Sequence, residues 1–314
     1  MIRTTCPYCG VGCGLKITPD GKGGADVVGD PDHPANRGRI CSKGAALGET
    51  LSLEDRLLYP EVDGRRVSWD IALDTVADGV REIVTRHGPD AVAFYVSGQL
   101  LTEDYYAANK LIKGFLGTAN IDTNSRLCMA SSVAGHKRAF GSDTVPGLYE
   151  DFELADLVVL VGSNLAWCHP VLFQRLEAAK RARPAMRIVV VDPRRTETCD
   201  IADLHLGLKP GSDVALFNAL LAELQRRGAT ARRFVDKHTV GMDDALIAAR
   251  ASDVDQCDLP KADLETFFGW FARTEKTVTL YSQGVNQSSA GVDKVNALIN
   301  CHLLTGRIGR PGMG

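Results

Sequence analysis

The residues best suited to chemistry are four cysteines near the start of the chain. Cys6, Cys9 and Cys13 form the pattern C-x2-C-x3-C within "TTCPYCGVGCGL", and Cys41 follows in "RICSKG". Three thiolates from one tight loop and a fourth from elsewhere commonly hold an iron–sulfur cluster. The glycines between them let the backbone wrap closely and turn N–H groups toward sulfur. The spacing therefore favours a [4Fe-4S] cluster.

Two other interpretations of these cysteines stay open on spacing alone. Structural zinc usually takes two separated C-x2-C pairs, whereas here three cysteines are grouped and one is apart. Disulfides are rare in reducing compartments. Because no apolar signal-peptide core precedes Cys6, we expect a cytoplasmic protein whose cysteines serve metal binding, catalysis or core packing.

Two regions of different amino-acid composition must position these cysteines and any metal centre that they bind. Residues 1–58 are rich in glycine and turn-forming stretches, so we expect a small cluster-binding domain that needs its metal centre for stability. Residues 59–314 are expected to form an α/β region. Its helical patterns, such as 69–88 and 169–183, alternate with the apolar runs "AVAFYVSG", "ADLVVLVGSN", "MRIVVVDPRR" and "TVTLYSQG". This alternation predicts a doubly wound, mostly parallel sheet covered by helices on both faces.

Polar residues follow each of these apolar runs. They are Gly98-Gln99, Gly162-Ser163-Asn164, Asp192-Pro193-Arg194-Arg195 and Gln283-Gly284. Ligands of open α/β sheets bind beyond the carboxyl ends of the strands. A polar loop after one strand is ordinary, but four such ends together favour a nucleotide-sized ligand.

Composition excludes some classes of partner. The formal net charge is −3 and no dense Lys/Arg run is present, so nothing favours nucleic acid as a partner. No window approaches the roughly 18 uninterrupted apolar residues of a membrane span. We therefore expect neither nucleic acid nor membrane as a partner.

The motifs together resemble the molybdenum bis(molybdopterin guanine dinucleotide) oxidoreductases, a family that includes nitrate reductases and formate dehydrogenases. The resemblance rests on "TTCPYCGVGCGL" and "NRGRICSKGA" and extends through "NSRLCMASSVAGHKRAFGSD", "VVVDPRRT" and "LKPGSD" to "GRIGRPGMG". "RLCMASSVAG" and "GSNLAWCHP" look most like the assimilatory nitrate reductases. Family members continue well beyond this length, so we expect a fragment that lacks the C-terminal part of the family fold.

The resemblance implies roles for particular residues. Cys128, which alone would be interpreted as a small core residue, would be the thiolate bound to molybdenum. Lys43 would lie between cluster and pterin on the electron path. Arg126, beside the metal-binding loop, would draw in an anion or bind a pterin phosphate. The pterin and its guanine nucleotide arms would contact Gln99, Asn124, Gly162, Ser163, Asn164, Asp192, Arg194, Arg195, Thr196, Gly211, Ser212, Asp213, Gln283 and Gln287. The remaining candidates are interpreted as structural: Cys168, Cys199, Cys257, Cys301 and His169.

One position bears on the substrate. Formate dehydrogenases of this family typically follow the metal-binding residue with a histidine that handles the formate proton. Here the next residue is Met129, whose thioether suits packing beside a metal better than proton transfer. Compared with the formate dehydrogenases of the family, Met129 favours nitrate as the substrate, although it could also be a simple packing residue.

The resemblance implies that the protein reduces nitrate to nitrite with molybdenum. Electrons would enter at the [4Fe-4S] cluster and pass through the pterin. The donor would be ferredoxin, flavodoxin or an NADH-linked flavoprotein. A formate dehydrogenase with the same cofactors and a non-catalytic iron–sulfur electron-transfer subunit are the alternatives.

Overall fold

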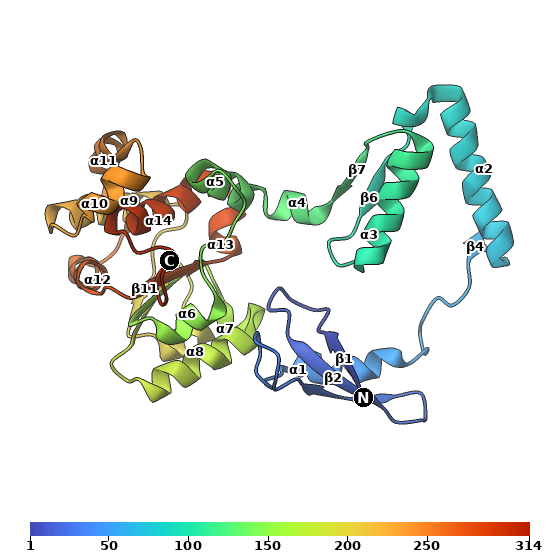
Figure 1. Ribbon diagram of the computed structural model, residues 1–314, viewed down its shortest axis with the longest axis horizontal. Coiled ribbons are helices and arrows are strands. Elements are labelled where there is room, and N and C mark those ends of the chain that lie inside the picture. The colour runs from blue at the N-terminus through green and yellow to red at the C-terminus, as the bar shows by residue number, and fades with distance from the viewer. The chain divides into compact units, whose positions relative to one another are not determined.

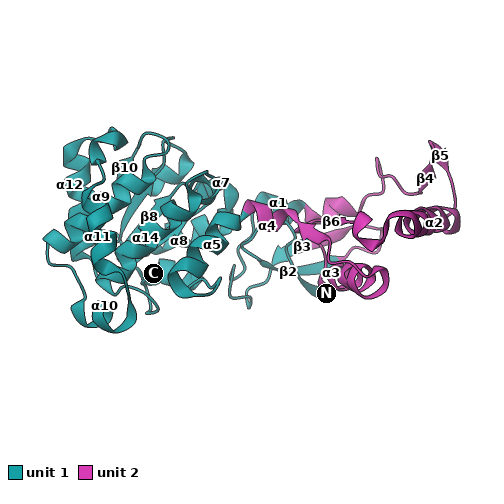
Figure 2. Cartoon of the chain, turned by 90° about the horizontal axis from the view of Figure 1, so that it is seen from above, with its two compact units in different colours: residues 1–18, 27–46, 129–314 teal, residues 19–26, 47–128 magenta.

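The computed structural model describes residues 1–314, which divide into two compact units (Figure 2). Unit 1 comprises residues 1–18, 27–46 and 129–314, and unit 2 comprises residues 19–26 and 47–128. The expected domain division at residues 58 and 59 stays a prediction.

The chain begins with a small sheet in the order β1-β2-β3. Its strands are β1 (Ile2–Thr5), β2 (Gly14–Pro19) and β3 (Ala25–Gly29), with β1 antiparallel to β2. The short helix α1 (Ser42–Ala45) and a 3-10 turn (Ala46–Leu51) follow. Few apolar residues of this region are buried, among them Val11 and Leu15, as expected for a loop-rich unit that a metal centre stabilises.

The centre of unit 1 is a four-stranded sheet in the order β10-β9-β8-β11. All its neighbouring strands are parallel: β8 (Leu157–Val161), β9 (Arg187–Val191), β10 (Leu204–Leu206) and β11 (Thr277–Tyr281). Val161 is level with both Val191 and Tyr281. The carboxyl ends of β8, β9 and β11 therefore lie side by side at one end of the sheet, which we call its carboxyl edge.

Helices cover both faces of this sheet (Figure 1). Along β8, Val159 and Val161 belong to one hydrophobic cluster, whereas Val158 and Leu160 belong to another. The first cluster includes side chains of α9 (Asp213–Arg226), α11 (Met242–Arg250), α12 (Lys261–Arg273) and α14 (Gly291–Thr305). The second includes side chains of α6 (Tyr149–Leu154), α7 (Leu165–Cys168) and α8 (Pro170–Ala182). The predicted doubly wound, mostly parallel α/β fold is confirmed.

The remaining helices of unit 1 are α5 (Ala130–Phe140), α10 (Arg232–His238) and α13 (Gln283–Asn286), with 3-10 turns at Glu197–Ile201 and Val254–Cys257.

Unit 2 holds a separate two-stranded parallel sheet of β6 (Phe94–Val96) and β7 (Ile121–Thr123). Its other elements are β4 (Glu61–Val62), β5 (Arg65–Arg66), α2 (Trp69–His87), a 3-10 turn (Pro89–Ala91), α3 (Thr102–Asn109), a π-helix (Lys110–Leu116) and α4 (Asn124–Cys128). As predicted, the periodic segment at 69–88 is helical and stops at Gly88, which has a φ of +81°. Ile112 is the one fully buried hydrophobic residue of this unit.

One expectation about the sheet was wrong. The run "AVAFYVSG" was expected to join the other apolar runs in one sheet, but its strand β6 pairs with β7 in unit 2. β7 is the next strand after β6, separated from it by α3 and the π-helix. Strands that are consecutive along a chain usually become neighbours. The fourth strand of the large sheet is instead β10, an edge strand of only three residues that periodicity did not reveal.

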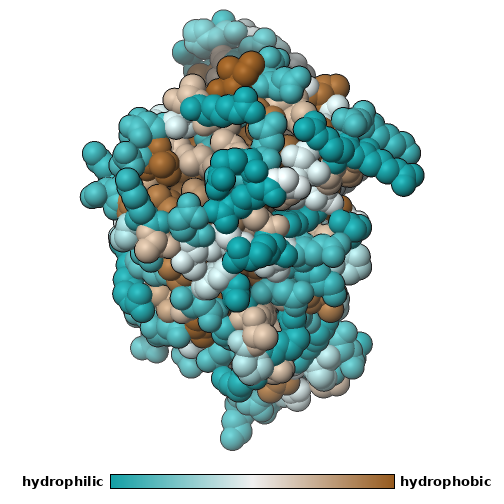
Figure 3. All heavy atoms as spheres, turned by 90° about the vertical axis from the view of Figure 1, so that its left-hand side faces the viewer, coloured by the Kyte–Doolittle hydropathy of each residue, from teal (hydrophilic) through white to brown (hydrophobic).

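Neither the helices nor the surface view in Figure 3 shows an extended apolar feature. None of the helices combines the length and hydrophobicity that crossing a membrane requires. Seen from the side on which α10 and α12 lie in Figure 1, the surface is mostly hydrophilic, with apolar side chains in small separate areas (Figure 3). Exposed apolar residues scattered in this way are ordinary.

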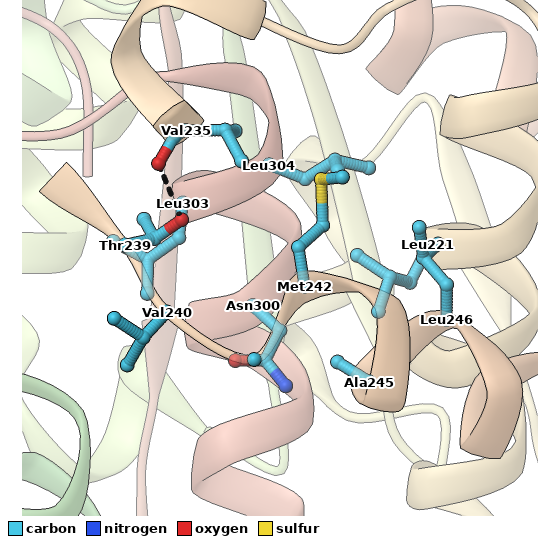
Figure 4. Close-up of a pocket in the computed structure, with 11 residues that line it drawn as sticks. Leu221, Val235, Thr239, Val240, Met242, Ala245, Leu246, Asn300, Leu303 and Leu304 are labelled. Carbon is cyan, nitrogen blue, oxygen red and sulfur yellow. Dashed lines mark hydrogen bonds between the residues drawn. The ribbon is translucent and has the colours of Figure 1, made fainter. Parts of the chain in front are cut away.

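A small cavity of about 50 Å³ lies in the helical layer, lined by residues of α9, α10, α11 and α14. Its walls are mainly aliphatic and include Leu221, Leu246 and Leu304 (Figure 4). At its side, the Thr239 hydroxyl donates to the carbonyl of Val235 at 2.8 Å. An apolar cavity of this size is an ordinary packing gap, and it lies outside the loops at the ends of the strands.

His302, a buried residue of α14, makes the stability of unit 1 depend on pH. The Thr279 hydroxyl lies 2.7 Å from Nε2, and Nδ1 donates to the carbonyl of Arg307 at 3.1 Å. Burial, together with the nearby Arg307 charge, lowers the pKa of His302 from its ordinary 6.5 to about 4. Between about pH 4 and pH 6.5, His302 is therefore protonated in the unfolded chain but neutral in the folded chain.

We predict that the free energy of unfolding falls as the pH decreases from 6.5 toward 4, by about 1.4 kcal/mol per pH unit from His302 alone. The substitution His302→Gln removes the titration, so the slope should become shallower by this amount. Urea unfolding of both proteins at several pH values in this range checks it. Equal slopes would contradict the buried, neutral state of this imidazole.

Candidate functional site

The four predicted cluster cysteines lie in unit 1 and come from two segments. Cys6 follows β1, Cys9 and Cys13 lie in the loop that leads to β2, and Cys41 directly precedes α1. The Cys6 N–H donates to the carbonyl of Cys13 at 2.8 Å, which closes the loop. Within it, Gly12 has a φ of +66°, a conformation that favours glycine. The loop thus turns tightly enough to bring its three thiols together.

The thiols share one environment. Burial, followed by the neighbouring thiols of Cys6, Cys9 and Cys41, raises the pKa of Cys13 to about 11. Burial likewise raises the pKa of Cys6, and the Cys9 and Cys41 thiols add to the effect. Negative charge on these sulfurs is therefore unfavourable unless cations lie among them. A cluster of iron ions meets this requirement, so the donor set fits a [4Fe-4S] cluster.

No group of three or more His, Cys, Asp or Glu side chains is arranged to hold a single metal ion. A four-iron cluster does not need such convergence, because each thiolate binds a different iron.

Asn36 joins the two cysteine segments, a role that the sequence analysis missed. Its side chain is fully buried. The side-chain oxygen accepts from the Gly14 N–H at 2.8 Å, and the side-chain nitrogen donates to the carbonyls of Gly14 and Arg39 at 2.9 and 2.8 Å. The start of β2, next to Cys13, is thereby fixed to the segment that leads to Cys41. An asparagine in a glycine-rich loop carries no pattern that distinguishes this role.

Lys43 lies in α1, two residues after Cys41, and its side chain is exposed. This places a cation on the short helix that follows the fourth cluster cysteine. Its predicted role on the electron path stays a prediction.

The loops at the carboxyl edge of the large sheet hold most of the residues predicted to bind the nucleotide arms. The Gly162 N–H donates to the carbonyl of Val191 at 2.9 Å, and the Gly284 N–H donates to the carbonyl of Gly162 at 3.1 Å. Asn164 accepts from the Thr198 hydroxyl at 3.0 Å. The loops after β8, β9 and β11 therefore meet backbone to backbone.

Two features of this edge fit a bound nucleotide. The Ser163 hydroxyl is buried and has no hydrogen-bond partner within the protein, so it is available to a ligand. A Cβ at Gly284 would lie 2.6 Å from the Cα of Gly162, so only glycine lets these loops approach so closely. The exposed residues beside them can reach a ligand from this edge: Arg194, Arg195, Gln283 and Gln287.

The other predicted nucleotide contacts follow β9 and β10. The Asp192 carboxylate accepts from the N–H of Arg194 at 2.8 Å, and Thr196 precedes a 3-10 turn. Gly211 is exposed and has a φ of +90°, and Ser212 and Asp213 are buried at the start of α9. The Asp213 carboxylate pairs with the buried ammonium of Lys294 at 2.7 Å.

Unit 2 holds the two residues predicted to touch the pterin. Gln99 follows β6 and Asn124 follows β7, and these strands are parallel. The Gly98 N–H donates to the side-chain oxygen of Asn124 at 2.6 Å. The structure therefore brings the two loops together at the carboxyl end of this small sheet.

The predicted molybdenum ligand, Cys128, is the last residue of α4 and of unit 2, and Met129 is the first residue of the segment of unit 1 that follows. In α4, the Arg126 guanidinium lies 3.4 Å from the Asp122 carboxylate, and both side chains are exposed. In unit 1, the side-chain nitrogen of Asn286 lies 3.6 Å from the sulfur of Met129. Arg126 is thus paired with a residue of β7, the strand that precedes its helix. The Met129 side chain is partly exposed, and its sulfur accepts from the Asn286 amide.

The cysteines interpreted as structural differ in exposure. The buried Cys257 and Cys301 thiols donate to the carbonyls of Ser212 and Phe217. Burial raises the pKa of both thiols, so they stay protonated. Cys199 is also buried, whereas Cys168 is exposed.

Comparisons with protein families match nearly the whole chain. The model of the molybdopterin oxidoreductase Fe4S4 domain matches residues 1–52, and the molybdopterin oxidoreductase model matches residues 56–314. The chain belongs to the molybdopterin oxidoreductase family. The predicted cofactors, a [4Fe-4S] cluster and molybdopterin, are those of the matched domains.

Individual relatives of this molybdopterin oxidoreductase differ in similarity. It is 58% identical to a nitrate reductase of Klebsiella oxytoca over 99% of the chain, and 46% identical to one of Shewanella frigidimarina over 100%. The identity to the F420-dependent formate dehydrogenase subunit alpha of Methanocaldococcus jannaschii is 32%. The chain spans only 36%, 35% and 47% of the lengths of these relatives.

Among solved structures, acetylene hydratase from Pelobacter acetylenicus matches with a TM-score of 0.84 and 21% sequence identity. The match covers 98% of this chain and 43% of that structure. At this identity the likeness shows the fold alone, and it supports the α/β architecture described above.

The close approach of Gly162 and Gly284 yields a test of the nucleotide site. Gly284→Ala places a methyl group against the backbone of Gly162, so the loops after β8 and β11 must separate. Overpacking of this kind costs about 1–3 kcal/mol. Because about 1.4 kcal/mol corresponds to a tenfold change in binding, we predict that the molybdenum bound per chain falls about tenfold while the iron content is unchanged. Gly79→Ala is the control, because a Cβ there meets nothing within 4 Å. Unchanged molybdenum in Gly284→Ala would place the nucleotide elsewhere.

Proposed function

We propose that this protein reduces nitrate to nitrite with molybdenum, using electrons that enter at a [4Fe-4S] cluster. The observation that carries the proposal is its 58% identity to a nitrate reductase across 99% of the chain, against 32% to a formate dehydrogenase subunit. The shared thiol environment, the buried Ser163 hydroxyl and the glycine contact at the sheet edge support cofactor binding.

In this proposal the chain's own residues hold two groups. Cys6, Cys9, Cys13 and Cys41 bind the cluster, and the Cys128 thiolate binds molybdenum. When bound, the molybdenum cofactor supplies two-electron oxygen-atom transfer, and its sulfur-rich ligands suit a metal that changes oxidation state. The loops after β8, β9 and β11 hold the nucleotide arms, with the Ser163 hydroxyl and nearby arginines as donors.

The reaction consumes two electrons and two protons and converts nitrate to nitrite and water. The thioether of Met129 is not a base and cannot take up the proton of formate, and the side-chain amide of Asn286 lies against it. This suits a site that accepts an oxyanion better than one that removes a proton from formate. Arg126, oriented by Asp122, supplies positive charge on the helix that carries Cys128.

The same proposal extends to the type of enzyme, its location and its electron donor. The motifs "RLCMASSVAG" and "GSNLAWCHP" favour an assimilatory enzyme, which works in the cytoplasm. Its donor would be ferredoxin, flavodoxin or an NADH-linked flavoprotein. Lys43 would carry positive charge between cluster and pterin and ease electron passage.

Metal analysis and a dye assay test the function. We predict about four irons and about one molybdenum per full-length chain, with oxidation of a reduced viologen dye by nitrate. A metal centre supplies several kcal/mol of the stabilisation of the transition state, so Cys128→Ala should lower the rate by roughly a hundredfold or more and leave iron unchanged. Cys168→Ala is the matched control, because its thiol is exposed.

Each alternative has its own outcome. Reduction of the dye by formate without nitrate activity would identify a formate dehydrogenase. Iron without molybdenum, with cofactor supply intact, would identify an electron-transfer subunit. Zinc without iron after strictly anaerobic preparation would refute the cluster assignment.

A further inference from the structure

Tyr149, the first residue of α6, reaches from the α/β part of unit 1 to the cysteine loop. Its hydroxyl oxygen lies 3.0 Å from the carbonyl oxygen of Gly10 and 3.3 Å from that of Val11. Both carbonyls lie between Cys9 and Cys13 in the sequence. The hydroxyl therefore contacts the middle of the loop that carries three of the four cluster cysteines.

The charge environment of this hydroxyl agrees with that position. Burial raises the pKa of Tyr149, and the thiols of Cys9 and Cys13 raise it further. The phenol is therefore protonated at neutral pH, and its O–H is available as the donor to these carbonyls.

A second side chain holds the other cysteine segment from the same side. Arg175 of α8 is buried, with an exposed fraction of 1%, and its Nη1 donates to the carbonyls of Pro34 and Ala35 at 2.9 and 2.7 Å. Its Nε donates to the carboxylate of Glu153 at 2.8 Å. The guanidinium carbon lies 5.9 Å from the centre of the Tyr149 ring. The segment that leads to Cys41 and the loop of Cys9 and Cys13 are thus held by adjacent side chains of α8 and α6.

We propose that Tyr149 is a positioning residue for the iron–sulfur cluster: its hydroxyl fixes the peptide groups from Gly10 to Gly12 and thereby sets the reduction potential of the cluster. Potentials of such clusters depend on the backbone dipoles and hydrogen bonds near the sulfurs and on access of solvent. With the two carbonyls held by the hydroxyl, they cannot turn toward the sulfurs. When the hydroxyl is absent, the peptides relax, carbonyl oxygens approach the sulfurs, and the more negative reduced state becomes less favourable.

The substitution Tyr149→Phe removes the hydroxyl and keeps the ring. The experiment uses full-length protein prepared anaerobically with its cluster, and follows the reduced cluster by EPR during a redox titration. At the wild-type midpoint, the ratio of reduced to oxidised cluster should fall about fivefold, the factor expected for one hydrogen bond of ordinary strength. Iron release to a ferrous chelator should accelerate by a similar factor.

Tyr281→Phe is the matched control. It removes another partly buried hydroxyl of unit 1, which lies 3.0 Å from the hydroxyl of Ser132 and not against the cysteine loop. This variant should keep the wild-type potential and rate of iron release.

An unchanged potential in Tyr149→Phe would overturn the proposal, even with faster iron release, because the hydroxyl would then affect stability alone. If circular dichroism shows that Tyr149→Phe does not fold, 3-fluorotyrosine at position 149 replaces it as the test. It keeps the ring and the hydroxyl but makes the hydroxyl a stronger donor to the Gly10 and Val11 carbonyls. The potential should then rise, and a wild-type potential would overturn the proposal. None of these readouts requires nitrate turnover, so they separate this inference from the proposed function.

Discussion

Burying a guanidinium costs free energy unless acceptors surround it. Two of the three guanidinium nitrogens of Arg175 have hydrogen bonds, and these join two parts of unit 1, whereas Nη2 has only the Glu150 carboxylate at 3.6 Å. The hydrogen bonds of Arg175 go to a carboxylate of α6 and to two carbonyls of the segment that leads to Cys41. Arg37 of the same segment pairs with Glu150 and Glu153. The cysteine region has little core of its own, so these charged contacts fix it to the sheet-based body and determine where the thiols lie.

The second constraint is geometric and lies at the carboxyl edge of the large sheet. Parallel strands end level there, and two glycines allow the loops after β8 and β11 to touch through their backbones. A buried hydroxyl without a protein partner remains at the same edge. Together these features support the nucleotide site that we propose at this edge, where ligands of parallel α/β sheets bind.

The parts that the sequence predicted are those with local signals. The cysteine spacing, the helix that ends at Gly88 and the apolar runs of β8, β9 and β11 each depend on residues close together in the chain. The three-residue strand β10 and the placement of β6 in a second sheet depend on pairing between distant segments, which periodicity does not contain. Asn36, Tyr149 and Arg175 were missed for the same reason, because their partners lie 22 to 141 residues away.

The most direct test of the account asks whether electrons pass from the cluster to nitrate through the site that contains Cys128. Full-length protein is reduced anaerobically, mixed with nitrate, frozen within one turnover and examined by EPR. The account predicts that the signal of the reduced cluster disappears in the wild-type protein, in proportion to its molybdenum content, and persists in Cys128→Ala. A signal that persists in wild-type protein containing molybdenum would contradict it.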